Sequence, residues 1–381
     1  MKLSKRFLLV NLILATVFVA NAQTISLITA TPSSSTTVGA GTCVRIGKSS
    51  GSALSSVTTN NPTTNNTFVG FNTGFLNAAG SDNTFVGWGA GYSNNGSTAA
   101  YNTFLGRSAG GANTTGGNNT FVGGLTGLKN TTGPNNVFIG FGAGSNNATG
   151  GNNVCTGWGS GPNASAWNNC TYGFLAGNLS TGGSNVLIGS ESGYNSGSYN
   201  VLIGSNSGYN SGSYNVMIGH QSGQNETGSN KLYISNSNTT TPLIWGDFAA
   251  SQLKLNGKVG VGNVSAFPTN TLYDNYKLFV TGGILTDEIR VALSASGNWP
   301  DYVFAKNYKL QPLCELESFI KNNGHLPNVL SAKEVKADGI NVGEMARIQQ
   351  EKIEELTLYL IQQNKEIEEL KAQVKTILSK K

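Results

Sequence analysis

A pattern of polar and apolar positions recurs ten times between residues 66 and 223. Each unit begins with asparagine, followed by three residues that are mostly β-formers, a glycine, three further residues and a second glycine. The first glycines lie 15 to 19 residues apart: Gly70, Gly87, Gly106, Gly123, Gly140, Gly157, Gly173, Gly189, Gly204 and Gly219. So short a period, with one strand in each unit, predicts a parallel β-solenoid, or β-roll, over residues 61–230.

The three residues between the asparagine and the first glycine are apolar on both faces of the predicted strand. Successive strand residues point to opposite faces, so one face can fill the inside of the coil and the other needs a cover. Self-association of several chains would provide that cover. The middle positions are Phe68, Phe85, Phe104, Phe121, Phe138, Cys155, Thr171, Leu187, Leu202 and Met217.

The asparagines and glycines have separate expected roles. We expect the asparagines to stack from coil to coil as a ladder, each side-chain amide bonding the amides above and below it. The glycines permit corners with positive φ or close backbone approach. Segments rich in Asn, Gly and Ser, such as residues 94–97 and 195–198, are expected to form the return turns.

The pattern changes after residue 230. Short alternating strands with glycine turns predict a β-rich neck over residues 231–298. Residues 299–341 read as a small helical assembly region. It contains a helix over residues 313–323 that stops at Gly324, and a second short helix that ends at Gly339.

Residues 342–381 carry a heptad repeat, which predicts a parallel coiled coil of two or three strands. A helix that folds back on its own domain is the alternative. Paired acids such as Glu354 and Glu355 are expected on the solvated outer face. The residues expected at the trimer seam are Ile353, Leu356, Leu360, Gln363, Ile367, Leu370, Val374 and Ile377.

The amino-terminal residues 1–22 have the features of a signal peptide, with a basic start, an apolar stretch and small residues before Gln23. The apolar run is shorter than the ~20 residues of a membrane span. We therefore expect a secreted or cell-surface protein whose mature chain has no transmembrane segment. Residues 23–60 are rich in Ser, Thr and Gly, and we expect either a lead-in to the solenoid or an attachment segment.

The charge distribution and the lack of recognisable catalytic motifs argue against nucleic-acid binding and enzyme activity. Residues 61–230 contain only five charged side chains and no basic stripe, so we expect no nucleic-acid partner. The chain has two histidines and no recognisable catalytic set, metal-ligand cluster or phosphate loop. We therefore expect no enzyme activity, no cofactor and no metal. A third possibility, a polysaccharide-processing spike, is disfavoured because the sequence shows none of the clustered carboxylates that such enzymes need.

The cysteines leave one question open. Cys155 and Cys170 occupy neighbouring strand positions in successive units, so their side chains are expected on opposite faces. A disulfide between them would need a shift of register, whereas an oxidising destination favours one. The sequence leaves both states possible.

The repeated unit, Asn-x-[FVL]-[IV]-Gly-x-x-[AS]-Gly, resembles the head repeat of trimeric autotransporter adhesins. The similarity covers residues 66–228, with coils longer than the usual head repeat. It implies a left-handed parallel β-roll in which three chains pack about an axis, and a role in adhesion.

The carboxyl-terminal region, residues 284–378, resembles that of bacterial tail-fibre-like surface proteins. The matching segments are WPDYVF (299–304), NGHLP (323–327), SAKEV (331–335) and KIEELTLY (352–359). This resemblance implies a trimerising or assembly role, comparable with the endosialidase-type intramolecular chaperone. Self-cleaving members of that class use a Ser-Asp dipeptide, which residues 284–378 lack.

Two functions therefore compete. The first is a homotrimeric fibre-like adhesin that binds surfaces or glycans through the β-roll. The second is a structural shaft or matrix component without a ligand of its own. Exposed corner aromatics would serve as sugar platforms in the first and would pack on one another in the second. The candidate ligand contacts are Phe71, Trp88, Tyr92, Phe141, Trp158, Tyr194 and Tyr209.

Overall fold

The computed structural model describes residues 43–53, 65–163, 165–267, 274–292 and 299–380. Two compact units divide the chain between Thr281 and Gly282. The predicted signal peptide and most of the predicted lead-in lie outside the described residues.

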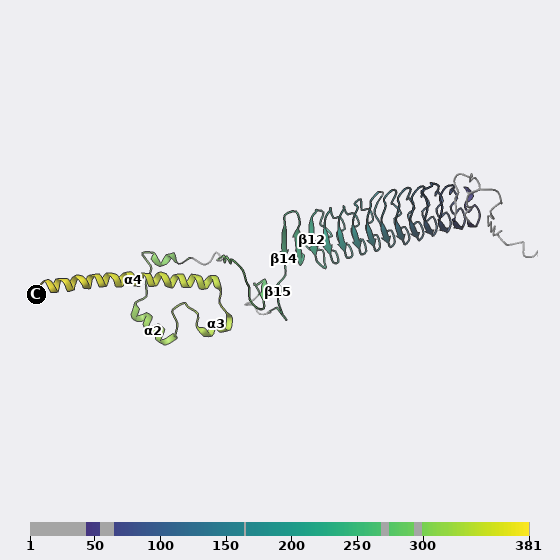
Figure 1. Ribbon diagram of the computed structural model, residues 1–381. Helices are drawn as coiled ribbons and strands as arrows, with labels where there is room; N and C mark the ends of the chain where they lie inside the picture. Colours follow the sequence, from purple (N-terminus) through teal and green to yellow (C-terminus); the bar gives the residue numbers. More distant parts are fainter. Residues whose placement is uncertain (1–42, 54–64, 164, 268–273, 293–298, 381) are drawn as a thin grey trace, which may run out of the picture. The chain divides into compact units, whose positions relative to one another are not determined.

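The first unit is a parallel β-solenoid of twelve coils, which confirms the predicted fold. Strands β1 to β12 follow one another in sequence order along a single sheet (Figure 1). Their bounds are β1 (Val44–Ile46), β2 (Thr67–Val69), β3 (Thr84–Val86), β4 (Thr103–Leu105), β5 (Thr120–Val122), β6 (Val137–Ile139), β7 (Val154–Thr156), β8 (Cys170–Tyr172), β9 (Val186–Ile188), β10 (Val201–Ile203), β11 (Val216–Ile218) and β12 (Lys231–Ile234). Strands about 4.8 Å apart make a rod on the order of 50 Å long.

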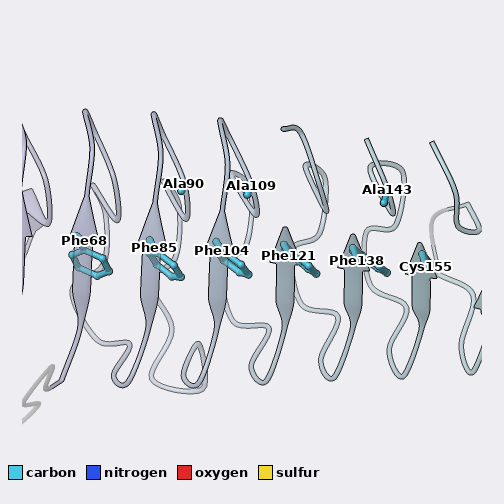
Figure 2. Packing of buried hydrophobic residues seen from close by; sticks show 9 residues of the cluster. All are labelled: Phe68, Phe85, Ala90, Phe104, Ala109, Phe121, Phe138, Ala143 and Cys155. Carbon is cyan, nitrogen blue, oxygen red and sulfur yellow. The ribbon is translucent and has the colours of Figure 1, made fainter. Parts of the chain in front are cut away.

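The core is a column of the middle strand residues. Phe85 pairs in register with Phe104, and Phe104 with Phe121, so identical side chains meet from β2 to β6. The rings of Phe104 and Phe121 stack with centroids 4.8 Å apart and planes 7° apart (Figure 2). Beyond β8 the column continues with Leu187, Leu202, Met217 and Tyr233. The outer strand positions remain half-buried or exposed in the single chain.

The first and second glycines of the unit exclude a side chain for different steric reasons. A Cβ on Gly106, whose φ is +140°, would lie 2.3 Å from the carbonyl oxygen of Gly123 in the next coil. A Cβ on Gly110, whose φ is +59°, would lie 2.4 Å from Cε2 of Phe104. The first glycine therefore lets successive backbones stack, and the second lets the core ring lie against the chain.

The predicted asparagine ladder exists, but its bonds differ from those expected. The Oδ1 of Asn102 accepts the backbone N–H of Asn119 (2.9 Å), and its Nδ2 donates to the turn carbonyl of Gly116 (3.0 Å). The asparagine side chain therefore bonds mainly to backbone groups, and it links the next strand to a turn. Three coils add a direct amide–amide bond.

A second buried ladder, three residues after the second glycine, makes the amide–amide bonds that we expected of the first. Asn113 donates to Oδ1 of Asn94 (2.7 Å) and accepts from Asn130 (2.9 Å). Its five members are Asn77, Asn94, Asn113, Asn130 and Asn147. In later coils serine takes this position, as at Ser180 and Ser196.

The sheet extends beyond the predicted bounds of residues 61–230 at both ends. In the β1 coil, Cys43 stands where other units have asparagine and Arg45 takes the core position. The Arg45 guanidinium donates to the carbonyl of Gly51 (3.0 Å). In the last coil Lys231 takes the asparagine position and donates its N–H to Asn215 (2.8 Å). Both end coils keep the backbone path without the asparagine.

Short strands follow the parallel sheet. Strands β13 (Ile244–Asp247) and β14 (Gln252–Leu255) join β12 in antiparallel fashion, and β15 (Val259–Val261) pairs with β16 (Leu278–Val280) in parallel. The sheet direction reverses at β13, beyond Gly223, the last of the repeated glycines. The predicted neck therefore begins inside the solenoid sheet.

The second unit is helical. It contains the 3-10 helix η3 (Pro300–Phe304), α2 (Leu313–Asn323), α3 (Ala332–Asp338) and α4 (Val342–Ser379). As the sequence predicts, α2 stops at Gly324, which has φ +74°. Ser331 and Glu334 cap α3 reciprocally. The helix α4 is continuous over 38 residues.

Candidate functional site

Two rows of residues form one corner of the solenoid. The first corner row consists of the residues directly after each first glycine, and the second corner row of those directly after each second glycine. In the first row, Phe71 stacks on Trp88 with centroids 6.4 Å apart. In the second row, Phe75 stacks on Tyr92 at 5.1 Å. The period of the backbone therefore brings corresponding aromatic side chains together.

A groove of about 530 Å³ lies between these rows over the coils of β2, β3, β4 and β5. We call it the corner groove; its lining residues are Asn72, Trp88, Gly89, Tyr92, Ser93, Ser108, Gly111, Ala112, Leu128 and Lys129. Trp88 is 51% exposed, so much of its indole ring is available to a ligand. Aromatic walls with a few polar groups are typical of small-ligand sites.

Only two of the seven predicted ligand contacts, Trp88 and Tyr92, line the corner groove. Phe71 belongs to the same aromatic row, packed on Trp88. Phe141 is exposed farther along the first corner row, where its ring leans over Gly124.

The other predicted contacts form separate stacks. Trp158 stacks on Phe174 at 5.0 Å, and Tyr194 on Tyr209 at 4.9 Å. Partial burial, together with the neighbouring Tyr194, raises the pKa of Tyr209, so this phenol stays neutral at physiological pH. Mutual stacking leaves these rings with a structural role as well as an exposed edge.

A second surface of interest is the heptad stripe of α4. Every residue predicted at the trimer seam is exposed in the single chain. Leu356 and Leu360 are each more than half exposed, as are Val374 and Ile377. Nothing in the described residues covers this stripe, which runs through the length of the helix.

The opposite face of α4 is covered by its own chain. The segment 300–311, which we call the strap, includes η3 and packs along the first half of the helix. Val303 of the strap and Ile348 of α4 are buried. The hydroxyl of Tyr302 donates to Glu351 (2.6 Å), and that of Tyr308 donates to Glu355.

These contacts overturn one expectation of the sequence. Glu354 is buried, not solvated, and one of its carboxylate oxygens accepts a hydrogen bond from Gln350 (3.0 Å). With Ile353 at heptad position a and Leu356 at d, the strap contacts Arg347, Glu351 and Glu355 at positions b, f and c. These positions would form the outer face of a coiled coil. Arg347 adds ion pairs to Glu344 (2.7 Å) and Glu351 (3.1 Å) beneath the strap.

Cys155 and Cys170 lie in neighbouring strands without forming a disulfide. The register pairs Cys170 with Val154 and leaves Cys155 opposite Thr171. Cys155 is buried and Cys170 exposed, and both are free thiols. Across the described ranges, no three His, Cys, Asp or Glu side chains gather closely enough to hold a metal ion.

None of the described helices has the length and hydropathy needed to cross a membrane. Comparisons with protein-family models, with curated proteins and with solved structures give no significant match.

Proposed function

We propose that this is a secreted or cell-surface fibre-like protein, a homotrimer joined through α4, that presents its solenoid for binding to surfaces or glycans. The observation that carries the proposal is the division of α4 into two faces. The chain's own strap covers positions b, c and f, whereas the a and d stripe is bare. A helix built in this way buries its seam only against other copies.

The solenoid supports a role in display. Its coils repeat one backbone path along a rod, and its corner rows expose aromatic, hydroxyl and amide groups. Adhesion proteins need such a rigid, extended surface, and sugar recognition uses these groups.

The alternative is a structural shaft without a ligand. The mutual stacking of Trp158 with Phe174 and of Tyr194 with Tyr209 favours this alternative, because stacked rings stabilise neighbouring coils on their own. Binding of the full chain to cell surfaces or saccharides distinguishes the two functions.

Sedimentation equilibrium tests the assembly. We expect residues 23–381 to have three times the mass of one chain. A double substitution in the seam, Leu360→Lys with Ile367→Lys, should give monomers, because charged groups cannot be buried there unpaired. Ala372→Lys, which adds a lysine at an exposed f position, is the matched control and should leave the mass unchanged. A wild-type monomer would overturn the proposal.

A further inference from the structure

Both cations of the repeat units lie at or beside the corner groove. Of the five charged residues in 61–230, only Arg107 and Lys129 are cations. The guanidinium of Arg107 lies 5.4 Å from the centre of the Trp88 ring, in the first corner row. Lys129 lines the corner groove from the next coil. Two cations therefore flank a surface that is otherwise neutral.

The three acids of the repeat units lie elsewhere. Asp82 belongs to a different row, where it accepts a hydrogen bond from Asn65 (2.9 Å). Glu191 and Glu226 follow β9 and β11, several coils away. Among the described residues, no ion pair involves Arg107 or Lys129.

Lys129 is held without being neutralised. Its Nζ donates to the amide oxygen of Asn146 in the next coil (3.0 Å). This amide orients the ammonium but carries no charge, so the ammonium remains available to an anion. Arg107 is exposed and makes a cation–π contact with Trp88. Its planar guanidinium carries donors whose geometry suits carboxylate and sulfate groups.

Gly111 gives the groove its depth. Its φ is not positive, and a Cβ there would meet Ser108 O at 3.3 Å and Leu128 Cδ1 at 3.6 Å. The backbone path therefore does not require glycine at this position. In the second corner row Gly111 stands between Tyr92 and Leu128, and the missing side chain leaves space beside the tyrosine ring.

We propose that the corner groove binds an acidic saccharide. Trp88 and Tyr92 present their rings to the sugar, and Arg107 and Lys129 pair with its carboxylate or sulfate groups. This inference rests on the proposed function and specifies the class of ligand and the coils that bind it. A neutral glycan would leave both cations without an opposite charge.

The test is a saccharide array with uronic, sialic and sulfated members beside neutral ones, probed with the full chain. We expect binding to acidic members only, weakening as salt rises because exposed charges are screened. Replacing both cations, Arg107→Gln with Lys129→Gln, should weaken binding about ten-fold or more, as expected for lost charge-assisted hydrogen bonds. Gly111→Tyr should abolish it by filling the groove while keeping every aromatic and cation.

Two substitutions are matched controls. Trp158→Ala removes a tryptophan of the same corner row outside the groove, and Lys254→Gln removes a lysine whose ammonium lies over Trp245 in the antiparallel strands. Both should bind like the parent chain. Thermal unfolding shows whether each variant is folded, and the double charge variant tests the site if Gly111→Tyr does not fold.

The outcomes separate this inference from the proposed function. Binding to neutral saccharides, or acidic binding unaffected by Gly111→Tyr and by the charge variant, overturns the groove assignment and leaves a glycan-binding fibre in place. A trimer that binds no saccharide overturns the inference and favours the shaft.

Discussion

Phe138 and Cys155 are register partners in β6 and β7, and the stack of phenyl rings along the solenoid core ends between them (Figure 2). On the far side of Cys155 lies Thr171, and beyond it the aliphatic column begins at Leu187. Burial raises the pKa of the Cys155 thiol to about 12, against a smaller opposing contribution from the Thr171 side chain. The thiol is therefore neutral, and two cores of different chemistry meet here.

The aromatic column should carry much of the stability of the first coils. Phe121 is fully buried and stacks on Phe104 and Phe138 at 4.8 Å each. We expect Phe121→Ala to cost about 3–5 kcal/mol in the free energy of unfolding. Phe141→Ala, at an exposed corner, should cost under about 1 kcal/mol. Equal shifts of the denaturant midpoint in the two variants would show that the aromatic column does not contribute more to stability than the exposed corner.

The core junction should tolerate, and even gain from, an apolar residue. The hydroxyl of Thr171 is buried without a hydrogen bond of normal geometry among the described residues. Thr171→Val should therefore raise the free energy of unfolding, by about 1 kcal/mol. Thr126 is the matched control, because its buried hydroxyl donates to Gly123 O (2.7 Å). Thr126→Val should destabilise by a similar amount, and chemical unfolding of both variants measures the contrast.

The second ladder should be sensitive to loss of a single amide. Asn113 donates to Asn94 and to Gly116 O (2.9 Å) and accepts from Asn130, all in buried surroundings. Asn113→Ala leaves these partners unpaired and should cost about 3 kcal/mol or more. Asn113→Ser should cost less, since later coils have serine at this position.

An exposed amide row supplies the control for the ladder. Asn135 donates to Asn152 (3.1 Å) at the surface, so Asn135→Ala should change the free energy of unfolding by no more than about 0.5 kcal/mol. A loss at Asn135 as large as that at Asn113 would mean that burial does not set the value of these bonds.

Acid should loosen the strap from α4. Burial tends to raise the pKa of Glu351, but the hydrogen bond from Tyr302 and the cations Lys352 and Arg347 outweigh it, so the pKa is lowered. The pKa of Glu344 is lowered as well, chiefly by Arg347. These carboxylates stabilise the folded unit above the ordinary glutamate pKa of about 4.3, and that stability is lost as pH falls through their lower folded values.

Circular dichroism at 222 nm during thermal unfolding between pH 7 and pH 2 measures this dependence. Glu351→Gln should lower stability at pH 7 and flatten the decline below about pH 4. Glu368→Gln, whose carboxylate pairs with Lys371 at the exposed end of α4, is the control and should keep the parent profile. If the pH profile of Glu351→Gln matched that of the parent, the contact between Glu351 and the strap would not be the cause of the loss of stability in acid.

Much of the fold could be predicted from the sequence because its determinants are local and repeated. The glycines at the corners exclude a side chain for steric reasons that recur in every coil, as at Gly106 and Gly110. Identical residues then meet in register, and the strand period places Phe104 inside. The heptad likewise follows from spacing within one helix. The repeat pattern does not identify the two end coils, because Cys43 and Lys231 replace the asparagine there.

Other features depend on contacts between residues far apart in the chain, and only the tertiary structure decided them. The Asn113 ladder exists because a corner turn is buried beneath the coil, although its sequence reads like any polar loop. Tyr302 reaches Glu351 across 49 residues and covers a helix face that the charge pattern assigned to solvent. The corner groove is formed by residues of four successive coils, with the space at Gly111 between two larger neighbours. Spacing along a chain determines which backbone path can repeat, whereas burial and hollows depend on which side chains the completed path brings together.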